Sequence, residues 1–287
     1  MPDRSTDPEP QPDSAPAPTG RACQNCGAPL VGTYCHECGQ RHLSTLRVRD
    51  LARLFVEAIF ELEDLQRGAW RTVVQAARNP GRVARRYAGG ERKRFINPIG
   101  YFLMAATGAF LVFLLFRDSW VQGQVEILTT TWRSMGVEPS ELFEPGAPYR
   151  VMFGVTSVQE LAQVLFEWVQ QLQTYSGFVI GAAAALFLRA FFPDYSLGEA
   201  LVFELYVTAQ ATVLTALLAP LFFTAAPGLV GAVGPLLQVG LHAHGGRAFF
   251  GGRWRGWLLP ALAYLAGMIV FILLSALIGL IGTTLVV

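Results

Sequence analysis

Long stretches without a charged side chain constrain this chain more than any other feature. Residues 98–116 contain no Asp, Glu, Lys or Arg. As an α-helix, this stretch would be about 28 Å long, close to the bilayer hydrocarbon core of about 30 Å. Charged residues make up only 15% of the 287 residues, against about 25% in soluble domains. A cytosolic globular enzyme, a disordered regulator and a secreted disulfide scaffold are therefore excluded.

Four further apolar runs follow the first, which we place at residues 96–116. Pro or Gly residues separate them, and they lie at about residues 176–192, 198–225, 228–241 and 257–285. The run at 228–241 is short and rich in glycine, so a spanning and a re-entrant segment are both open. The predicted fold class is mostly α, a helical integral membrane protein with about five spans, four of them in a membrane domain at 176–287.

Basic residues are distributed unevenly around these runs, and their positions predict the orientation. Residues 117–175 form a polar insert with three basic and seven acidic residues. Cytoplasmic loops carry an excess of Lys and Arg near a span, so we assign this insert to the outside. The residues assigned to the inside precede the first and last spans: Arg82, Arg85, Arg86, Arg92, Lys93, Arg94, Arg247, Arg253 and Arg255. The sequence thus predicts a multi-pass protein of the inner (plasma) membrane with a cytoplasmic N-terminus and an extracytoplasmic C-terminus.

The region before the first span divides into a tail, a cysteine cluster and helices. Residues 1–20 are rich in Pro and polar residues and lack an apolar stretch, which indicates a disordered tail rather than a secretory signal. Residues 47–95 are predicted to form cytoplasmic amphipathic and basic helices at the membrane interface, because apolar residues recur there at helical spacing. The first of them is expected to end at Asn79-Pro80, and a break at Gly68 is left open.

The cysteine cluster has the spacing of a metal site. Two C-x2-C pairs direct four thiolates at one ion, and such a closed set is typical of structural zinc. The four ligands are Cys23, Cys26, Cys35 and Cys38. We therefore predict a small zinc ribbon at residues 21–42 with Zn2+ as its structural cofactor, stabilised by the metal because the segment has almost no core. Two disulfides, a redox dithiol and an iron–sulfur centre are the alternatives.

The partner of this ribbon is less constrained by the sequence. Arg21 and Arg41 are the only basic residues in the segment, which is few for neutralising phosphates and disfavours nucleic-acid binding. Docking of an unidentified protein partner, self-association, or simple capping of the chain is favoured instead.

A basic strip, residues 79–98, leads into the first span. It contains six Lys and Arg residues together with Tyr87 and Phe95. One interpretation is recognition of anionic lipid headgroups, because polybasic segments beside a membrane gain about 1 kcal/mol per Lys or Arg. The other is that the strip sets the topology and anchors the chain in the bilayer interface.

Ionisable residues within the apolar runs are further candidates for a site. Glu199 is expected at a helix N-terminus, where the helix dipole favours an anion. Glu204 lies deeper and is interpreted either as a structural partner of Arg189 or as a proton or ion site. His242 and His244 would point to opposite sides of a helix, so we expect interfacial histidines rather than a shared metal site.

The order of these motifs is more specific than any one of them. The pattern CxNCGxxLxGxYCxxCGQ at residues 23–40 precedes an amphipathic helix with Asp64 and Thr72, and NPG…RYxGGxRxxFxNP follows at residues 79–98. This order resembles a bacterial family of unknown function whose members are polytopic membrane proteins with a short N-terminal four-cysteine zinc ribbon. The resemblance implies a zinc-ribbon membrane protein with the four cysteine ligands, and it implies no catalytic residue.

The favoured function is a non-catalytic scaffold or a regulatory docking protein at the cytoplasmic membrane face. The chain lacks nucleotide-binding, metalloprotease and serine-hydrolase motifs, which disfavours an enzyme but leaves that class open. The alternative is a small transporter or a lipid-handling protein that uses Glu204 and Arg189.

Overall fold

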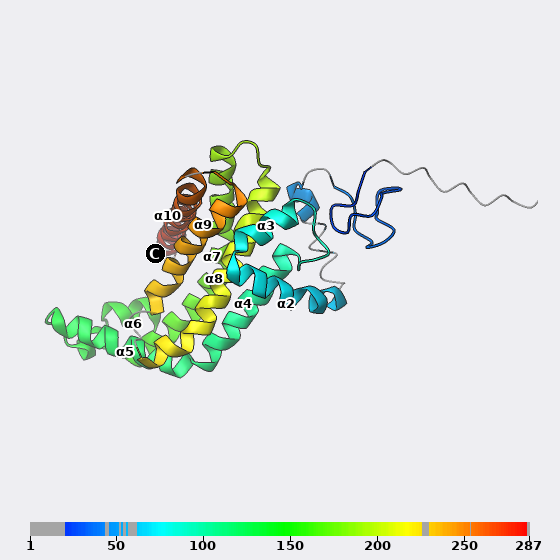
Figure 1. The fold of residues 1–287 in the computed structure, drawn as a ribbon. Coiled ribbons are helices and arrows are strands. Elements are labelled where there is room, and N and C mark those ends of the chain that lie inside the picture. The colour runs from blue at the N-terminus through cyan, green and yellow to red at the C-terminus, as the bar shows by residue number, and fades with distance from the viewer. Residues whose placement is uncertain are drawn as a thin grey trace, which may run out of the picture.

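A computed structural model describes residues 21–43, 46–51, 53, 56, 62–225, 230–252 and 254–285 (Figure 1). Within these residues the chain is mostly helical, and its β pairing is limited to two isolated bridges, Ala22–Pro29 and Tyr34–Arg41. The predicted fold class is confirmed at this level. The tail predicted at 1–20 and part of the helix predicted at 47–78 lie outside the described residues.

Two helices precede the first apolar run. Helix α2 (Leu62–Arg78) continues through Gly68, so a break at Gly68 is wrong. The first predicted helix ends at Asn79-Pro80 as expected, and helix α3 (Pro80–Ala88) begins there, because the Asn79 side chain accepts a hydrogen bond from the Arg82 N–H and Pro80 occupies the first turn. Pro has no N–H to lose at that position, which makes it favourable there.

Three helices are long and apolar enough to cross a membrane. They are α4 (Pro98–Leu115), α8 (Leu197–Ala225) and α10 (Trp254–Leu285). Two further helices coincide with predicted spans but fall short of one: the apolar part of α7 (Val158–Phe191) is confined to Ser176–Phe191, and α9 (Val230–Phe249) is less apolar. The membrane-protein character is therefore supported by three candidate spans among the described residues, and the count of about five stays a prediction.

Helix α7 joins the polar insert to the apolar bundle without a break. Ser157 caps it by accepting from the Glu160 N–H, and the helix then continues for 34 residues. The predicted boundary at residue 175 therefore lies inside a helix. The insert also contains α5 (Arg117–Ser134), a short 3-10 helix (Pro139–Phe143) and α6 (Pro148–Phe153), and α5 and α6 lie at the end of the bundle remote from the cysteine segment (Figure 1).

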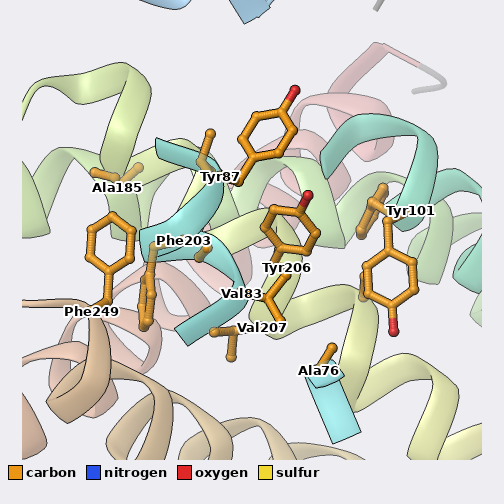
Figure 2. Packing of buried hydrophobic residues seen from close by; sticks show 14 of the residues in the cluster. Ala76, Val83, Tyr87, Tyr101, Ala185, Phe203, Tyr206, Val207 and Phe249 are labelled. Carbon is orange, nitrogen blue, oxygen red and sulfur yellow. The ribbon is translucent and has the colours of Figure 1, made fainter. Parts of the chain in front are cut away.

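Helix α8 occupies the centre of the bundle, where it packs against α3, α4, α7 and α9. Figure 2 shows Tyr206 of α8 between Tyr87 of α3 and Tyr101 of α4, and the rings of Tyr87 and Tyr206 meet edge to face at 5.7 Å. The Tyr101 hydroxyl donates to Gln210, and the Tyr206 hydroxyl donates to the carbonyl oxygen of Ile96. Helix α3, which lies in the region predicted to form interfacial helices, thus buries its apolar face against protein.

Close backbone contact holds α3 on the bundle. Gly81 of α3 meets Gly245 of α9, and a Cβ atom at Gly81 would collide with the Gly245 carbonyl group. Asn79 and His244 also form a hydrogen bond between their side chains at 2.9 Å. The start of the basic strip is therefore fixed against the end of α9 by two glycines and a polar contact.

Candidate metal centre and buried polar pair

The four predicted metal ligands meet in one cluster. The four sulfur atoms all lie within 4.8 Å of one another, and they belong to Cys23, Cys26, Cys35 and Cys38. The two knuckles have the same local structure, because the N–H of Gly27 donates to Cys23 and that of Gly39 donates to Cys35, each at 2.8 Å. Both glycines have positive φ angles, +81° and +67°, in the region that side chains with a Cβ disfavour.

The chemistry of this donor set fits a soft metal ion. The backbone N–H of Cys38 lowers the pKa of Cys35 to about 6, with a further contribution from the Glu37 N–H. At Cys26 the Ala28 N–H acts in the same direction, but desolvation by nearby atoms and the neighbouring thiols outweigh it and raise the pKa to about 12. Successive thiolates in one cluster repel one another, and a divalent cation removes that repulsion. The cluster can therefore hold a metal ion through four sulfurs.

A glutamine joins this cysteine module, residues 21–42, to the basic strip. The Gln40 side chain is buried; its Nε2 donates to the Gly90 carbonyl and its Oε1 accepts from the Arg92 N–H at 3.0 Å. The side chain of Gln24 packs against Gly90, whose φ of +111° and lack of a Cβ permit this approach. The cysteine cluster is thus attached to the turn between α3 and α4.

The basic side chains of the strip differ in their burial and in their partners. Glu91 accepts from Arg86 at 2.6 Å and from Arg94 at 3.0 Å, and the hydrogen bond from Arg86 lowers the pKa of Glu91. Arg92 is buried, and its burial lowers the pKa of its guanidinium. The exposed basic side chains of the strip are Arg82, Arg85, Lys93 and Arg94.

Glu204 has a different partner from the one expected. Its Oε2 lies 3.0 Å from Nε2 of His242, and both side chains are almost fully buried, at 1% and 0% exposure. The expected pairing with Arg189 is wrong, because Arg189 is exposed and donates to the Pro193 carbonyl. The interfacial position expected for His242 is also wrong, whereas His244 is exposed. Glu199 lies at the start of α8 as predicted and accepts from the Ser196 N–H.

A cavity of about 260 Å3 lies beside this pair, between α4, α7, α8, α9 and α10. Its walls combine aromatic rings with polar side chains, among them Phe102, Phe113, Thr208, Gln238 and Tyr264. The backbone carbonyl oxygen of Gln238 also lies 2.6 Å from His242 Nδ1. The Tyr264 ring stacks on His242 with a centroid separation of 4.6 Å. Gln238 and Tyr264 therefore line the cavity and also contact His242 of the pair.

Sequence reasoning identified Glu204 but missed Gln238, Thr208 and the role of His242. A usable signal was present, because Glu204 and Thr208 on one helix, and Gln238 and His242 on another, are spaced by four residues. Polar side chains at this spacing form one face of a helix. Two such faces in an apolar domain are expected to meet, since intramembrane polar groups otherwise lack partners.

Comparison with known proteins gives one partial match. Residues 67–110 match a family described as "Protein of unknown function (DUF3667)". The match covers most of α2, all of α3 and most of α4, so it includes the basic strip and lies outside the cysteine module. No curated protein and no solved structure matches the chain. The similarity to a family of unknown function thus rests on this region alone.

Proposed function

We propose that this chain is a non-catalytic scaffold or docking protein of the bacterial inner membrane, whose zinc-loaded cysteine module and basic strip form one cytoplasmic platform. The contact of Gln40 with Gly90 and Arg92 carries the proposal, because it makes the strip a direct neighbour of the metal cluster. Metal binding that orders the module also fixes the exposed basic residues for a partner protein or for anionic lipid headgroups.

The donor set supports zinc. Four thiolate ligands complete a tetrahedral shell and leave no position for a reacting water, as in structural zinc sites. His36 lies outside the group of four sulfurs and contacts Glu37 instead. The proposed role of the ion is therefore to stabilise the module, which is consistent with a platform and does not require chemistry at the metal.

Metal removal tests the platform directly. The full-length protein, purified in detergent with its metal, should contain one zinc per chain by elemental analysis. Treatment with a chelator should then speed hydrogen exchange at the Arg92 amide, because Gln40 no longer holds it. The Tyr101 and Gln210 region of α4 and α8 serves as the internal control and should keep its protection. Unchanged exchange at Arg92 after complete zinc loss would refute the platform.

Partner capture tests the docking role. Crosslinking in native membranes should recover the same partner with the wild-type chain and with an exposed-histidine variant, His36→Asn. Deletion of residues 21–42 or Gln40→Leu should abolish that crosslink while the protein still inserts. The docking role fails if the deletion leaves every crosslinked species in place.

Handling of a small solute within the membrane is the second candidate function. One observation favours it, namely a carboxylate buried against a histidine beside a cavity in the helix bundle. In this candidate function the partner of Glu204 is His242 and not Arg189, which the sequence had favoured. Solute flux into proteoliposomes that contain the purified protein tests this function, and absence of flux for all solutes that bind would reject it.

A further inference from the structure

Two buried oxygen atoms near the cavity have no hydrogen-bond donor within the described part of the chain. They are Oε1 of Glu204 and Oε1 of Gln238. Both are acceptors, so a ligand that satisfies them must bring donor groups. Glu199, the other carboxylate in the candidate spans, caps the start of α8 and is already hydrogen-bonded.

Gln238 belongs to the cavity wall, whereas Glu204 is one helical turn away from it. Thr208, which also lines the cavity, is one turn beyond Glu204 on α8. On the facing helix α7, Gly177 lines the cavity, and a Cβ atom added at Gly181, one turn further, would lie 3.8 Å from the Cβ of Glu204. One helical turn is about 5.4 Å, a distance that a glutamate side chain spans by changing rotamer.

The hydrogen bonds of His242 fix the number of protons in the pair. Its Nδ1 lies 2.6 Å from the Gln238 carbonyl oxygen, which only accepts, so Nδ1 carries a proton. The 3.0 Å contact between His242 Nε2 and Glu204 Oε2 then requires one shared proton, on either atom. The pair is neutral overall in both forms, which suits its complete burial.

The titratable groups that neighbouring helices place near the pair are phenols with their own contacts. Tyr264 of α10 stacks on His242. Tyr101 of α4 donates to Gln210, and Tyr206 of α8, which packs on Tyr87 of α3, donates to Ile96. Helix α7 places Gly181, which has no titratable side chain, next to Glu204. The proton that Glu204 and His242 share, rather than a phenolic one, is therefore the proton that a cation bound here would displace.

We propose that the cavity binds a small protonated primary amine with an apolar substituent, and that each amine bound displaces the proton shared by Glu204 and His242. The aromatic rings of Phe102, Phe113 and Tyr264 suit the apolar substituent and the adjacent positive charge. The ammonium N–H groups match the two oxygen acceptors. Charge balances because one ammonium enters, one proton leaves to water, and Glu204 becomes the counter-ion.

This inference deepens the second candidate function and does not depend on the metal platform. Binding without flux would reject solute handling and leave the binding site standing. Loss of zinc from the cysteine module should leave amine binding unchanged. The two proposals and the inference can therefore fail separately.

Calorimetric titration of the full-length protein in detergent micelles with n-butylammonium is the test. Two buffers of different ionisation enthalpy should report release of about one proton per amine bound. The apparent affinity should fall about tenfold for each unit by which the pH is lowered, since proton and amine compete. Tetramethylammonium, a cation without N–H donors, should bind at least tenfold more weakly.

Matched variants separate this site from the rest of the helix. Glu204→Gln should abolish saturable binding and proton release, and Glu199→Gln, which changes a carboxylate on the same helix, should preserve both. Helix content by circular dichroism and elution in gel filtration establish that the variants are folded. If Glu204→Gln does not fold, proton release by the wild-type protein decides the matter. Binding of n-butylammonium without proton release, or no saturable binding, would overturn the inference, as would unchanged binding by folded Glu204→Gln.

Discussion

The hydroxyl of Thr72 is expected to stabilise the chain just before the first candidate span, where it hydrogen-bonds the Ile96 amide. Thr72 is fully buried on α2; its Oγ1 donates to the Gly68 carbonyl and accepts from the Ile96 N–H at 3.0 Å. Replacement by Val keeps the shape of the side chain and leaves the buried Ile96 amide without its acceptor. An unpaired buried donor costs about 1–3 kcal/mol, so Thr72→Val should lower the free energy of unfolding by about that amount.

Hydrogen exchange gives a residue-level assay of this loss. A loss of about 1–3 kcal/mol corresponds to roughly 5- to 150-fold faster exchange at Ile96 in the full-length protein in detergent. Thr72→Ser, which keeps the hydroxyl and loses a methyl group, is the matched control and should exchange more slowly than Thr72→Val. Equal protection of Ile96 in the wild type and Thr72→Val would refute the reasoning, because the side-chain hydroxyl would then contribute nothing to that amide.

Two further perturbations probe the same region. Gly81→Ala should destabilise the docking of α3 by about 1–3 kcal/mol in thermal unfolding, whereas Gly240→Ala, at a helical position with open space around it, should be neutral or slightly stabilising; equal melting of the two variants would contradict the close contact. Glu91→Gln should remove about 1 kcal/mol or less at neutral pH. Because the hydrogen bond from Arg86 holds the pKa of Glu91 below its usual 4.5, this contribution is present above that value and is lost as the pH falls through the lowered pKa. The stabilities of wild type and Glu91→Gln should thus converge in acid, and a constant difference down to acid pH would exclude the ion pair as its source.

The sequence predicts those features that depend on local spacing. The cysteine cluster follows from two C-x2-C turns, and α4, α8 and α10 follow from apolar length alone. Residues 155–173 are expected to be helical from the sequence, and α7 does begin at Val158. Hydropathy alone does not join this segment to the apolar run that follows, because hydropathy measures contact with lipid and a helix continues wherever its backbone hydrogen bonds do. Hydropathy therefore finds the apolar part of that helix and misses its polar first half.

The partner of Glu204 depends on how two helices are rotated against each other, which local spacing does not determine. His242 is 38 residues away in sequence and reaches Glu204 only because α9 turns that face toward α8. Packing fixes this rotation: Gly245 of α9 accepts the close approach of Gly81, while Phe203 and Phe249 pack together at 5.3 Å. A pairing rule based on opposite charge selected Arg189 because it ignored this rotation.

The region that matches the family of unknown function consists largely of residues that shape the backbone. Asn79 and Asn97 cap successive helices, and each is followed by a proline in the first turn. Gly81 permits a helix crossing, and Gly90 allows the approach of Gln24 from the cysteine module. Each of these residue types is explained by a turn, a cap or a close contact, and none of them requires a substrate. The matched segment thus connects α2 and α3 to the bundle, while the buried Glu204–His242 pair lies outside it, on α8 and α9.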